Sequence, residues 1–322
     1  MAGKKTIVEG RGVKDTAAKR YFGQKEVFAD LCNAFLFQER GRLKPSMLKP
    51  MPTEYNELLP AIDGRHGSRK RTRDLSFQAY TDGDAGYALI CAEFQSAADN
   101  TMPVRVMEYD SLGYACQLRQ GTGGSAGKVL PISTIVVNLG RESWKGPTSL
   151  HGMFPEVNDF VKANVPDYPI RIYDPRTEDT KILDLLYTDL KIVSYLFRFS
   201  DRGDLLAQMY GDDGTSSLCR DGVDLVNVCL DMNLKEPEEG RRLEMCKAVE
   251  DLKAMGRKEG RKEGIARGIA RGRKEGISEG IAKVAANALR NRMSLVDVQA
   301  ITGLSEARIL QIAQKIKQGA NC

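Results

Sequence analysis

The sequence of 322 residues predicts an α/β protein whose mixed sheet is flanked by helices and followed by a helical C-terminal tail. Residues 74–80 alternate polar and apolar side chains with a period of two, which is typical of a half-buried strand. Residues 88–92 are continuously apolar, as in a central strand that is buried on both faces. In the tail, a glycine stands at every fourth position from Gly256 to Gly280, which is a true internal repeat.

The composition indicates a cytoplasmic protein. Hydrophobic residues make up 42% of the chain, enough for a core, yet no apolar run approaches the ~18 residues that span a membrane. The first residues have no apolar signal region. Seven cysteines without a Cys-x-x-Cys pair favour free thiols in a reducing compartment. With only His66 and His151, we expect neither a His-rich zinc site nor a Ser-His-Asp triad.

The chain begins with a predicted helix and a predicted loop. Residues 1–13 are expected to be disordered, and residues 15–39 carry an apolar stripe at helical spacing that includes Phe22 and Leu31. Residues 41–60 contain four prolines, which predict an irregular segment.

Further elements follow the paired strands. Pro103 is predicted to begin a helix, because the first helical turn does not use its missing N–H. Residues 131–139 are rich in β-branched residues and predict a strand, as do residues 168–173 more weakly. Residues 182–232 predict helices. The buried face of the helix that Pro103 begins is expected to comprise Val104, Met107, Leu112, Tyr114, Ala115 and Leu118.

Two carboxylates mark the candidate site. The pair Asp82-Gly83 predicts a hairpin turn between the two strands. If paired positions sum to 167, Asp74 lies opposite Glu93; if they sum to 165, Asp74 faces Cys91 and Glu93 is diagonal. Opposite residues lie roughly 5 Å apart at Cβ and diagonal ones roughly 7–8 Å. Either register therefore lets both carboxylates share one cation.

The residue types fit a metal-dependent phosphodiesterase. Gln95 points to the same face as Glu93, because side chains alternate along a strand. Magnesium, with Mn²⁺ as a substitute, suits two carboxylates that leave water molecules on the ion. Arg69, Lys70, Arg71 and Arg73 precede Asp74 directly. They form either a solvated surface loop or a set of contacts to a DNA backbone, for which arginine is a good bidentate donor.

These segments resemble the metal-binding hairpin of the PD-(D/E)xK nuclease superfamily. More narrowly, they resemble the Rpn family of recombination-promoting nucleases, whose members are also described as transposases. The resemblance extends from residues 28–34 through residues 102–110 to the glycine-periodic tail, and covers most of residues 14–315. It implies a restriction-endonuclease-like core in residues 14–235, with the initial strand lost in the proline-rich region.

The resemblance also implies an activity, a magnesium-dependent endonuclease acting on DNA in recombination or at mobile elements. Asp74 and Glu93 would hold the metal, the backbone carbonyl of Phe94 would complete its coordination, and Gln95 would orient a water molecule. Gln95 stands where the superfamily has lysine, so a catalytically weak or inactive DNA-binding or assembly protein is the alternative.

Three further residues could support the site, and each has an alternative interpretation. Asp30 contributes an acidic side chain to the site or is a solvated charge. Arg105 and Tyr109, one helical turn apart, point at the site or form an ordinary pair on the helix surface.

The tail is basic. Residues 241–292 contain 15 Lys and Arg against 7 Asp and Glu, a net charge of +8, so the rest of the chain carries −3 of the total of +5. Such a surplus favours a polyanionic partner. Residues 236–283 are either a flexible linker or a helix whose glycines allow close packing of a partner helix, as in a homo-oligomer, because each glycine costs a lone helix ~1 kcal/mol.

The last residues, 284–322, predict a helical hairpin. Ser294 is expected to cap a short helix, and residues 302–305 to form a tight turn. A helix-turn-helix is the alternative, with Ser305, Glu306, Arg308 and Gln311 facing a DNA groove.

Overall fold

The computed structural model describes residues 3–62, 65–81, 86–120 and 127–319, and within these the side chains of residues 3–11, 55–62, 65–71, 255–256, 258–260 and 317–319 are outside the description. The chain divides into two compact units, Met1–Leu252 and Lys253–Cys322. The first unit contains the sheet and the second contains the tail.

The first unit is built on a mixed sheet of five strands in the order β1-β4-β5-β6-β7. The strands are β1 (Leu48–Pro50), β4 (Leu75–Tyr80), β5 (Gly86–Gln95), β6 (Ile132–Asn138) and β7 (Arg171–Tyr173). β4 pairs antiparallel with β1 and β5, whereas β5, β6 and β7 are parallel. The predicted mixed sheet is thus confirmed, and the short strand β1 lies inside the proline-rich region.

The register of β4 against β5 follows the first of the two predicted alternatives. Leu75 pairs with Ala92 and Ser76 with Cys91, so paired positions sum to 167. A bulge near Tyr80 shifts the register by one at the far end of the pair. The predicted Asp82-Gly83 turn lies outside the described residues.

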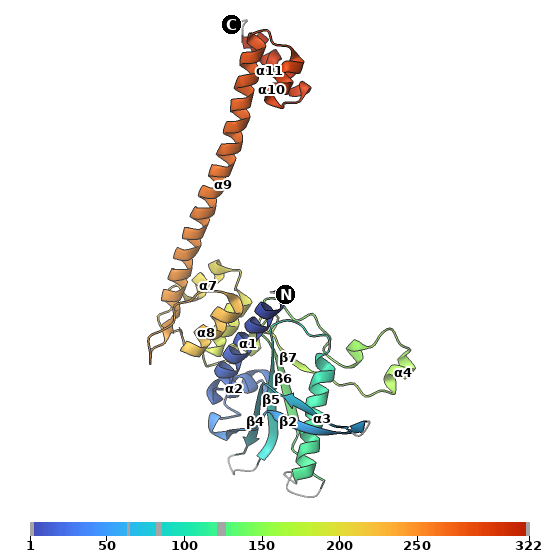
Figure 1. Ribbon diagram of the computed structural model, residues 1–322. Coiled ribbons are helices and arrows are strands. Elements are labelled where there is room, and N and C mark those ends of the chain that lie inside the picture. The colour runs from blue at the N-terminus through green and yellow to red at the C-terminus, as the bar shows by residue number, and fades with distance from the viewer. Residues whose placement is uncertain (1–2, 63–64, 82–85, 121–126, 320–322) are drawn as a thin grey trace. The chain divides into compact units, whose positions relative to one another are not determined.

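Helices cover both faces of the sheet (Figure 1). On one face lie α1 (Gly3–Phe22), α2 (Lys25–Leu31), α6 (Leu190–Arg198) and α8 (Arg220–Leu230). Ile90 and Ala92 of β5 pack in the same core cluster as Phe28 and Phe197 of these helices. On the other face lies α3 (Met102–Gln120), whose Met102 and Val106 pack with Val136 of β6. Alternate residues of β5 and β6 therefore enter different layers.

The predicted helix over residues 15–39 is divided in the structure. α1 begins at Gly3 and ends at Phe22, and α2 continues into a π-helix, η1 (Cys32–Phe37). The break lies at Gly23, where an added Cβ would be 2.5 Å from the carbonyl oxygen of Lys19. Only glycine fits this close approach, and Gln24 then begins α2 with an extended backbone.

The predicted loop over residues 41–60 is also wrong in part. A 3₁₀ turn, η2 (Pro45–Met47), precedes β1, and β2 (Glu54–Ile62) pairs with β3 (Arg65–Thr72) in a separate two-stranded sheet. Proline is tolerated in β1 because this strand lies at the edge of the main sheet, where an N–H can remain unpaired within the ladder.

The buried face of α3 differs from the predicted one. Val104 and Leu118 are 38% and 56% exposed, whereas Val106, Tyr109 and Asp110 are buried. The prediction assigned apolar side chains to the core and charged ones to solvent. It failed because Asp110 has a buried cationic partner, described below, that rotates the helix about its axis.

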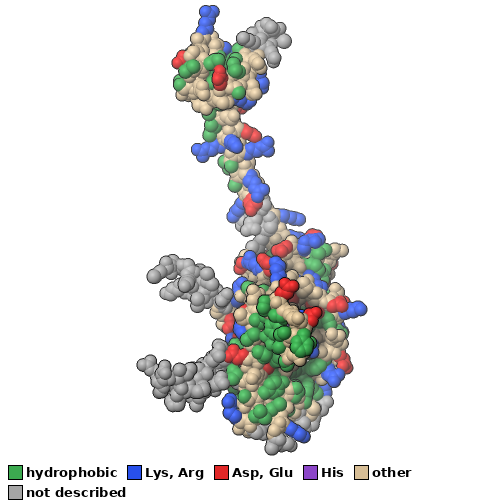
Figure 2. Space-filling view, turned by 90° about the vertical axis from the view of Figure 1, so that its right-hand side faces the viewer, with side chains coloured by type: hydrophobic (Ala, Val, Ile, Leu, Met, Phe, Trp, Pro, Cys, Tyr) green, Lys and Arg blue, Asp and Glu red, His purple; other side chains and the backbone are tan. Residues whose placement is uncertain are grey.

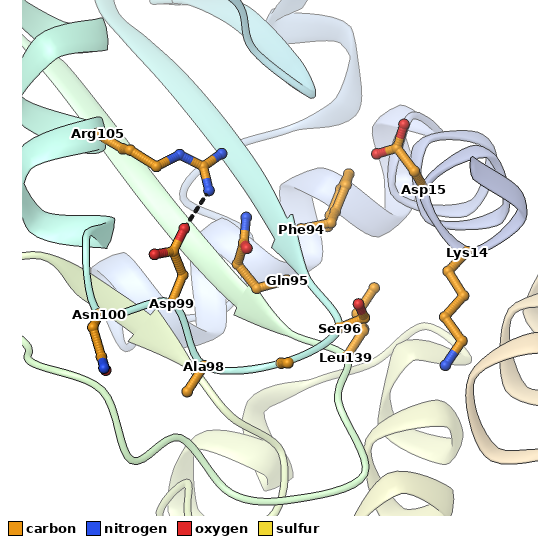
Figure 3. Close-up of a pocket in the computed structure, with 11 residues that line it drawn as sticks. Lys14, Asp15, Phe94, Gln95, Ser96, Ala98, Asp99, Asn100, Arg105 and Leu139 are labelled. Carbon is orange, nitrogen blue, oxygen red and sulfur yellow. Dashed lines mark hydrogen bonds and ion pairs between the residues drawn. The ribbon is translucent and has the colours of Figure 1, made fainter. Parts of the chain in front are cut away.

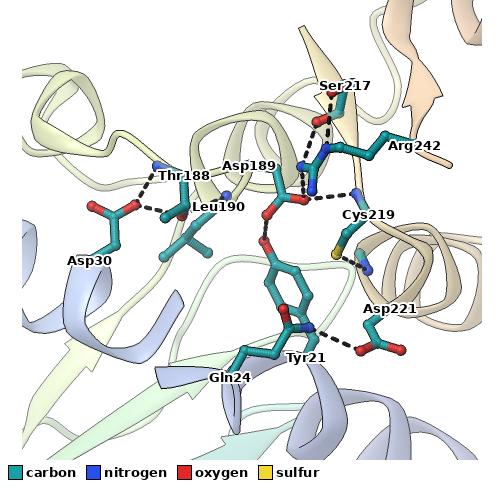
Figure 4. A network of polar contacts seen from close by, with 11 residues as sticks. Tyr21, Gln24, Asp30, Thr188, Asp189, Leu190, Ser217, Cys219, Asp221 and Arg242 are labelled. Carbon is teal, nitrogen blue, oxygen red and sulfur yellow. Dashed lines mark hydrogen bonds and ion pairs between the residues drawn. The ribbon is translucent and has the colours of Figure 1, made fainter. Parts of the chain in front are cut away.

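Residues 182–232 are mainly helical as predicted, although the short strand Ser217–Leu218 lies among the helices. The shorter elements of the first unit are η3 (His151–Met153), α4 (Asp159–Ala163), α5 (Thr180–Leu185), α7 (Gly203–Tyr210), β8 (Ser217–Leu218) and β9 (Leu243–Glu244). β8 and β9 form a small antiparallel pair. Arg242 next to β9 donates to the buried Asp189, which also accepts from the Tyr21 hydroxyl and the Cys219 N–H (Figure 4).

The second unit consists of the greater part of α9 (Met245–Arg290) with α10 (Leu295–Thr302) and α11 (Glu306–Gly319). Its small core contains Ala285, Ala288, Val298 and Ile309. The predicted cap is confirmed, since Ser294 Oγ accepts from the Asp297 N–H, and Gly303 ends α10 with a φ of +68°.

The repeat glycines lie on an exposed helix. Apart from the backbone of the helix itself, no described atom comes within 4 Å of a Cβ built on Gly264, Gly268, Gly272, Gly276 or Gly280. Figure 2 shows Lys and Arg side chains spaced along this part of the chain. Among the described residues, no helix combines the length and apolar character needed to cross a membrane.

Candidate active site at the carboxyl edge of the sheet

A cleft of about 410 Å³ lies beside the end of β5 (Figure 3). One wall comes from Lys14 and Asp15 of α1, another from Arg105 of α3, and the floor includes Gln95. Residues 96–100 and Leu139 complete the lining. β5 and β6 are parallel and both end here, and the carboxyl edge of parallel strands is where open α/β sheets bind ligands.

Asp74 immediately precedes β4 and faces the end of β5. Its Oδ2 accepts a hydrogen bond from the Phe94 N–H at 2.8 Å, and its Oδ1 is 2.9 Å from Lys19 Nζ. Burial raises the pKa of Asp74, while the Phe94 N–H and Lys19 act against this rise. The side chain is 16% exposed, so Asp74 is a mostly enclosed carboxylate at the mouth of the hairpin.

Glu93 is the more deeply buried carboxylate. It is 1% exposed, and its Oε1 has no hydrogen-bond partner among the described residues. Its Oε2 is 3.7 Å from a guanidinium nitrogen of Arg105. Burial, followed by repulsion from Asp74, raises the pKa of Glu93 to about 8. Without a cation, this carboxyl is therefore largely protonated at neutral pH.

The two carboxyl groups fit a hard divalent cation. A buried oxygen without a partner next to a second carboxylate is the arrangement that a bound cation would complete. Within the part of the chain that the structure describes, no group of three or more His, Cys, Asp or Glu side chains could hold a metal ion. A cation held by Asp74 and Glu93 would therefore need water or backbone oxygens as further ligands.

The two predicted supporting residues of α3, Arg105 and Tyr109, both lie near the site, but only Arg105 lines the cleft. Arg105 lines the cleft and donates to Asp99 at 2.6 Å as well as approaching Glu93. Tyr109 is buried, hydrogen-bonds to Arg105, and has its ring 5.4 Å from the guanidinium carbon of Arg73. Arg105 thus faces the cleft, whereas Tyr109 is buried behind Arg105 and hydrogen-bonds to it.

The prediction that Arg73 contacts DNA is wrong. Arg73 has no exposed surface, and its guanidinium donates to Asp110 at 2.6 Å and to Thr134 at 2.8 Å. A buried charge needs such partners because desolvation without them is costly. The side chains of Arg69, Lys70 and Arg71 lie outside the described residues, so their predicted role stays a prediction.

The prediction that Asp30 supports the site is also wrong. Asp30 is fully buried and accepts hydrogen bonds from the N–H and hydroxyl of Thr188 and from the Tyr187 N–H (Figure 4). Its oxygens hold the connection between α5 and α6. The side chain is therefore a structural anchor for that turn.

The prediction missed the contribution of α1. Lys14 and Asp15 line the cleft, and Lys19 contacts both Asp15, at 2.7 Å, and Asp74. The i,i+4 spacing of Asp15 and Lys19 signals an ion pair on a helix. Nothing in the spacing connects that pair to Asp74, because the contact depends on how α1 packs on the sheet.

Comparison with known proteins assigns a family to the middle of the chain. Residues 66–207 match the family model described as "Putative transposase, YhgA-like". The match runs from β3 into α7, and so includes Asp74, Glu93, Gln95 and Arg105. Neither the curated proteins nor the solved structures contain a significant match. Residues 66–207 are thus similar to the YhgA-like putative transposases, in agreement with the resemblance to the Rpn group that the sequence indicated.

Proposed function

We propose that this protein is a metal-dependent endonuclease that hydrolyses phosphodiester bonds of DNA during recombination or the movement of mobile elements. The observation that supports this proposal most is the buried Oε1 of Glu93, which has no partner among the described residues and lies beside Asp74. The next two residues of the strand, Phe94 and Gln95, line the cleft. The match of residues 66–207 to a family of putative transposases supports a role at mobile elements and DNA as the partner.

Each site residue has a role in this proposal. Asp74 and Glu93 hold Mg²⁺, for which Mn²⁺ substitutes, and the backbone carbonyl of Phe94 is a further ligand. When bound, such an ion polarises a phosphate and lowers the pKa of a coordinated water. Gln95 hydrogen-bonds to the attacking water or to a phosphate oxygen, because its amide offers both a donor and an acceptor in the cleft. Arg105 adds positive charge on the opposite wall.

Gln95 favours a second candidate function, DNA binding or assembly without strong catalysis. Gln95 is neutral, so β5 itself provides no ammonium group at this position. A catalytically weak or inactive nuclease fold that binds DNA or assembles on it accounts for that replacement and for the basic tail.

Cleavage of supercoiled plasmid DNA by the purified chain, with Mg²⁺ or with a chelator, separates the two functions. An endonuclease nicks the plasmid only with the metal. Asp74→Asn and Glu93→Gln each remove one ligand charge and should slow nicking by about 100-fold or more, which corresponds to ~3 kcal/mol of lost transition-state stabilisation. Gln95→Lys should retain or increase the rate.

The matched control is Glu142→Gln, a carboxylate that is exposed on the same unit. It should leave the rate unchanged, and circular dichroism should show that all variants keep the fold. Full nicking by Asp74→Asn at ordinary Mg²⁺ concentration would place the active site elsewhere.

A further inference from the structure

We propose that Lys19 is an exchangeable cation of this site: its ammonium group occupies the position of the divalent cation at Asp74, and turns to a substrate phosphate when that cation binds. This inference rests on the proposed function, because it assigns a role at the same carboxylates. It supplies from α1 the positive charge that residue 95 does not provide.

The first step of the inference is that Lys19 already contacts Asp74 as a cation would. Its Nζ is 2.9 Å from Asp74 Oδ1 and 2.7 Å from Asp15 Oδ2, so one ammonium group is shared by two carboxylates. The side chain is only 34% exposed. Burial lowers the pKa of Lys19, but the hydrogen bonds to Asp15 and Asp74 outweigh burial and raise it overall. Both contacts are at ion-pair distance, so the ammonium group lies between two carboxylates.

The second step concerns the oxygens of Asp74. Oδ2 is engaged by the Phe94 N–H inside the hairpin, and Oδ1 is the oxygen that Lys19 holds. A divalent cation that binds through Oδ1 must displace the ammonium group, because two cations repel each other at one oxygen. Lys19 and the metal therefore compete for Asp74.

The third step concerns where Lys19 goes. Asp15 lies one turn earlier on α1 and lines the cleft. It keeps the displaced ammonium group at the cleft wall, on the side opposite Arg105. Asp15 and Arg105 lie on opposite sides of the cleft, with Gln95 between them (Figure 3). A Lys19 ammonium group held by Asp15 would therefore face Arg105 across the space in which a phosphodiester anion would lie.

Cation binding to the DNA-free chain tests the competition. Lys19→Met keeps most of the aliphatic side chain but removes its charge. Isothermal titration should show that this variant binds Mn²⁺ about tenfold more tightly or better, because the ammonium group no longer competes with the ion for Asp74. Asp15→Asn should bind the ion more weakly than the native chain, because Lys19 then has Asp74 as its only carboxylate partner.

The matched control is Lys145→Met. Lys145 makes a similar ion pair with Glu142, at 2.7 Å, on the exposed surface of the same unit. Its removal should leave the Mn²⁺ affinity unchanged. Equal affinities for Lys19→Met and the native chain would overturn the inference.

DNA binding tests the second half. In Ca²⁺, fluorescence anisotropy of a labelled duplex should show weaker binding by Lys19→Met and a salt slope reduced by about 0.9, the value for one lost phosphate contact. Lys19→Arg should restore the slope. An unchanged slope for Lys19→Met would overturn the phosphate contact.

The two proposals fail separately. If the native chain never nicks DNA but Mn²⁺ affinity shifts as expected, the exchange at Asp74 stands and the nuclease proposal falls. If nicking occurs and Mn²⁺ affinity is indifferent to Lys19, only the inference about Lys19 falls.

Discussion

Folding strongly changes the ionisation of Glu93, one of the two carboxyl groups of the candidate site. Its pKa is raised to about 8, mainly because burial disfavours the charged carboxylate and Asp74 repels it. The folded protein therefore keeps a proton that the unfolded chain releases near pH 4.5. That proton contributes stability that is fully present below the unfolded pKa and is lost as the pH rises through the folded one.

We therefore expect the chelator-treated protein to lose stability between about pH 5 and about pH 9. Urea unfolding followed by circular dichroism should show a midpoint that falls across this range. Glu93→Gln should flatten the fall, because the amide mimics the protonated acid and does not ionise. Glu142→Gln, an exposed control, should keep the native slope. A native midpoint that rises with pH would contradict the protonated state of Glu93.

At the residue scale, the sequence was sufficient for the carboxylate pair and insufficient for its neighbours. Asp74 and Glu93 are related by strand pairing, and pairing follows from local alternation and a short connection. Arg73 was misassigned because a charged residue ahead of a strand is ordinarily solvated. Its partner Asp110 is 37 positions away on α3, and only tertiary packing brings the two together.

At the element scale, α9 is the part of the chain whose local chemistry is least favourable. Its repeat glycines from Gly264 to Gly280 are exposed, and no described atom outside the helix's own backbone fills the space above them. In a solitary helix each would be replaced by alanine with a gain of about 1 kcal/mol. Their retention at a strict spacing of four is accounted for by close approach of another helix, for which a second copy of this chain is the simplest proposal.

We predict that Gly264→Ala, Gly268→Ala, Gly272→Ala and Gly276→Ala together lower the mass measured by light scattering while raising the helical signal in circular dichroism. The added methyl groups favour the helix but block close approach of its partner. Deleting residues 256–281 should also lower the mass. A chain that is monomeric both before and after these changes would leave the repeat without a role in self-association.

Local patterns predicted the elements themselves better than their orientation. Ser294 as a cap, Pro103 at the start of α3 and residues 131–139 as a strand were read from neighbouring residues, and each was confirmed. The rotation of α3 and the strand β2 were not, because a buried ion pair and long-range pairing override the apolar pattern and the prolines.

At the scale of the whole molecule, charge and packing divide the chain at different places. The basic surplus begins near residue 241, and the tail was predicted to start at residue 236. In the structure the first unit extends to Leu252. Met245, Ala248 and Val249 at the start of α9 are buried in the main core, so packing assigns them to the first unit. The sequence did not predict this boundary, because three buried apolar residues among many charged ones do not form a recognisable apolar stripe.

The basic tail should make DNA binding strongly dependent on salt and largely independent of DNA sequence. Each phosphate contact contributes about 0.9 to the slope of log affinity against log salt. Replacing the exposed arginines of α9 by glutamine should flatten that slope in fluorescence anisotropy. The residues to replace together are Arg257, Arg261, Arg267, Arg271 and Arg273.

Three exposed lysines of the first unit, Lys128, Lys145 and Lys162, provide the control for these substitutions. Their replacement by glutamine should change the slope much less than the arginine changes do. If the slope is unmoved by all five arginine changes, the tail is a solvated connection and DNA is bound by the first unit alone.

The buried anchor at Arg73 has a mechanical consequence. The β2–β3 ribbon is a separate sheet that ends at Thr72, and the next residue is fixed to α3 and β6 through Asp110 and Thr134. Asp74 follows directly. Because Arg73 is buried and held by both partners, we expect a displacement of the ribbon to be resisted at Arg73 before it reaches Asp74. The position of Asp74 therefore depends on the core of the first unit rather than on the ribbon that precedes it.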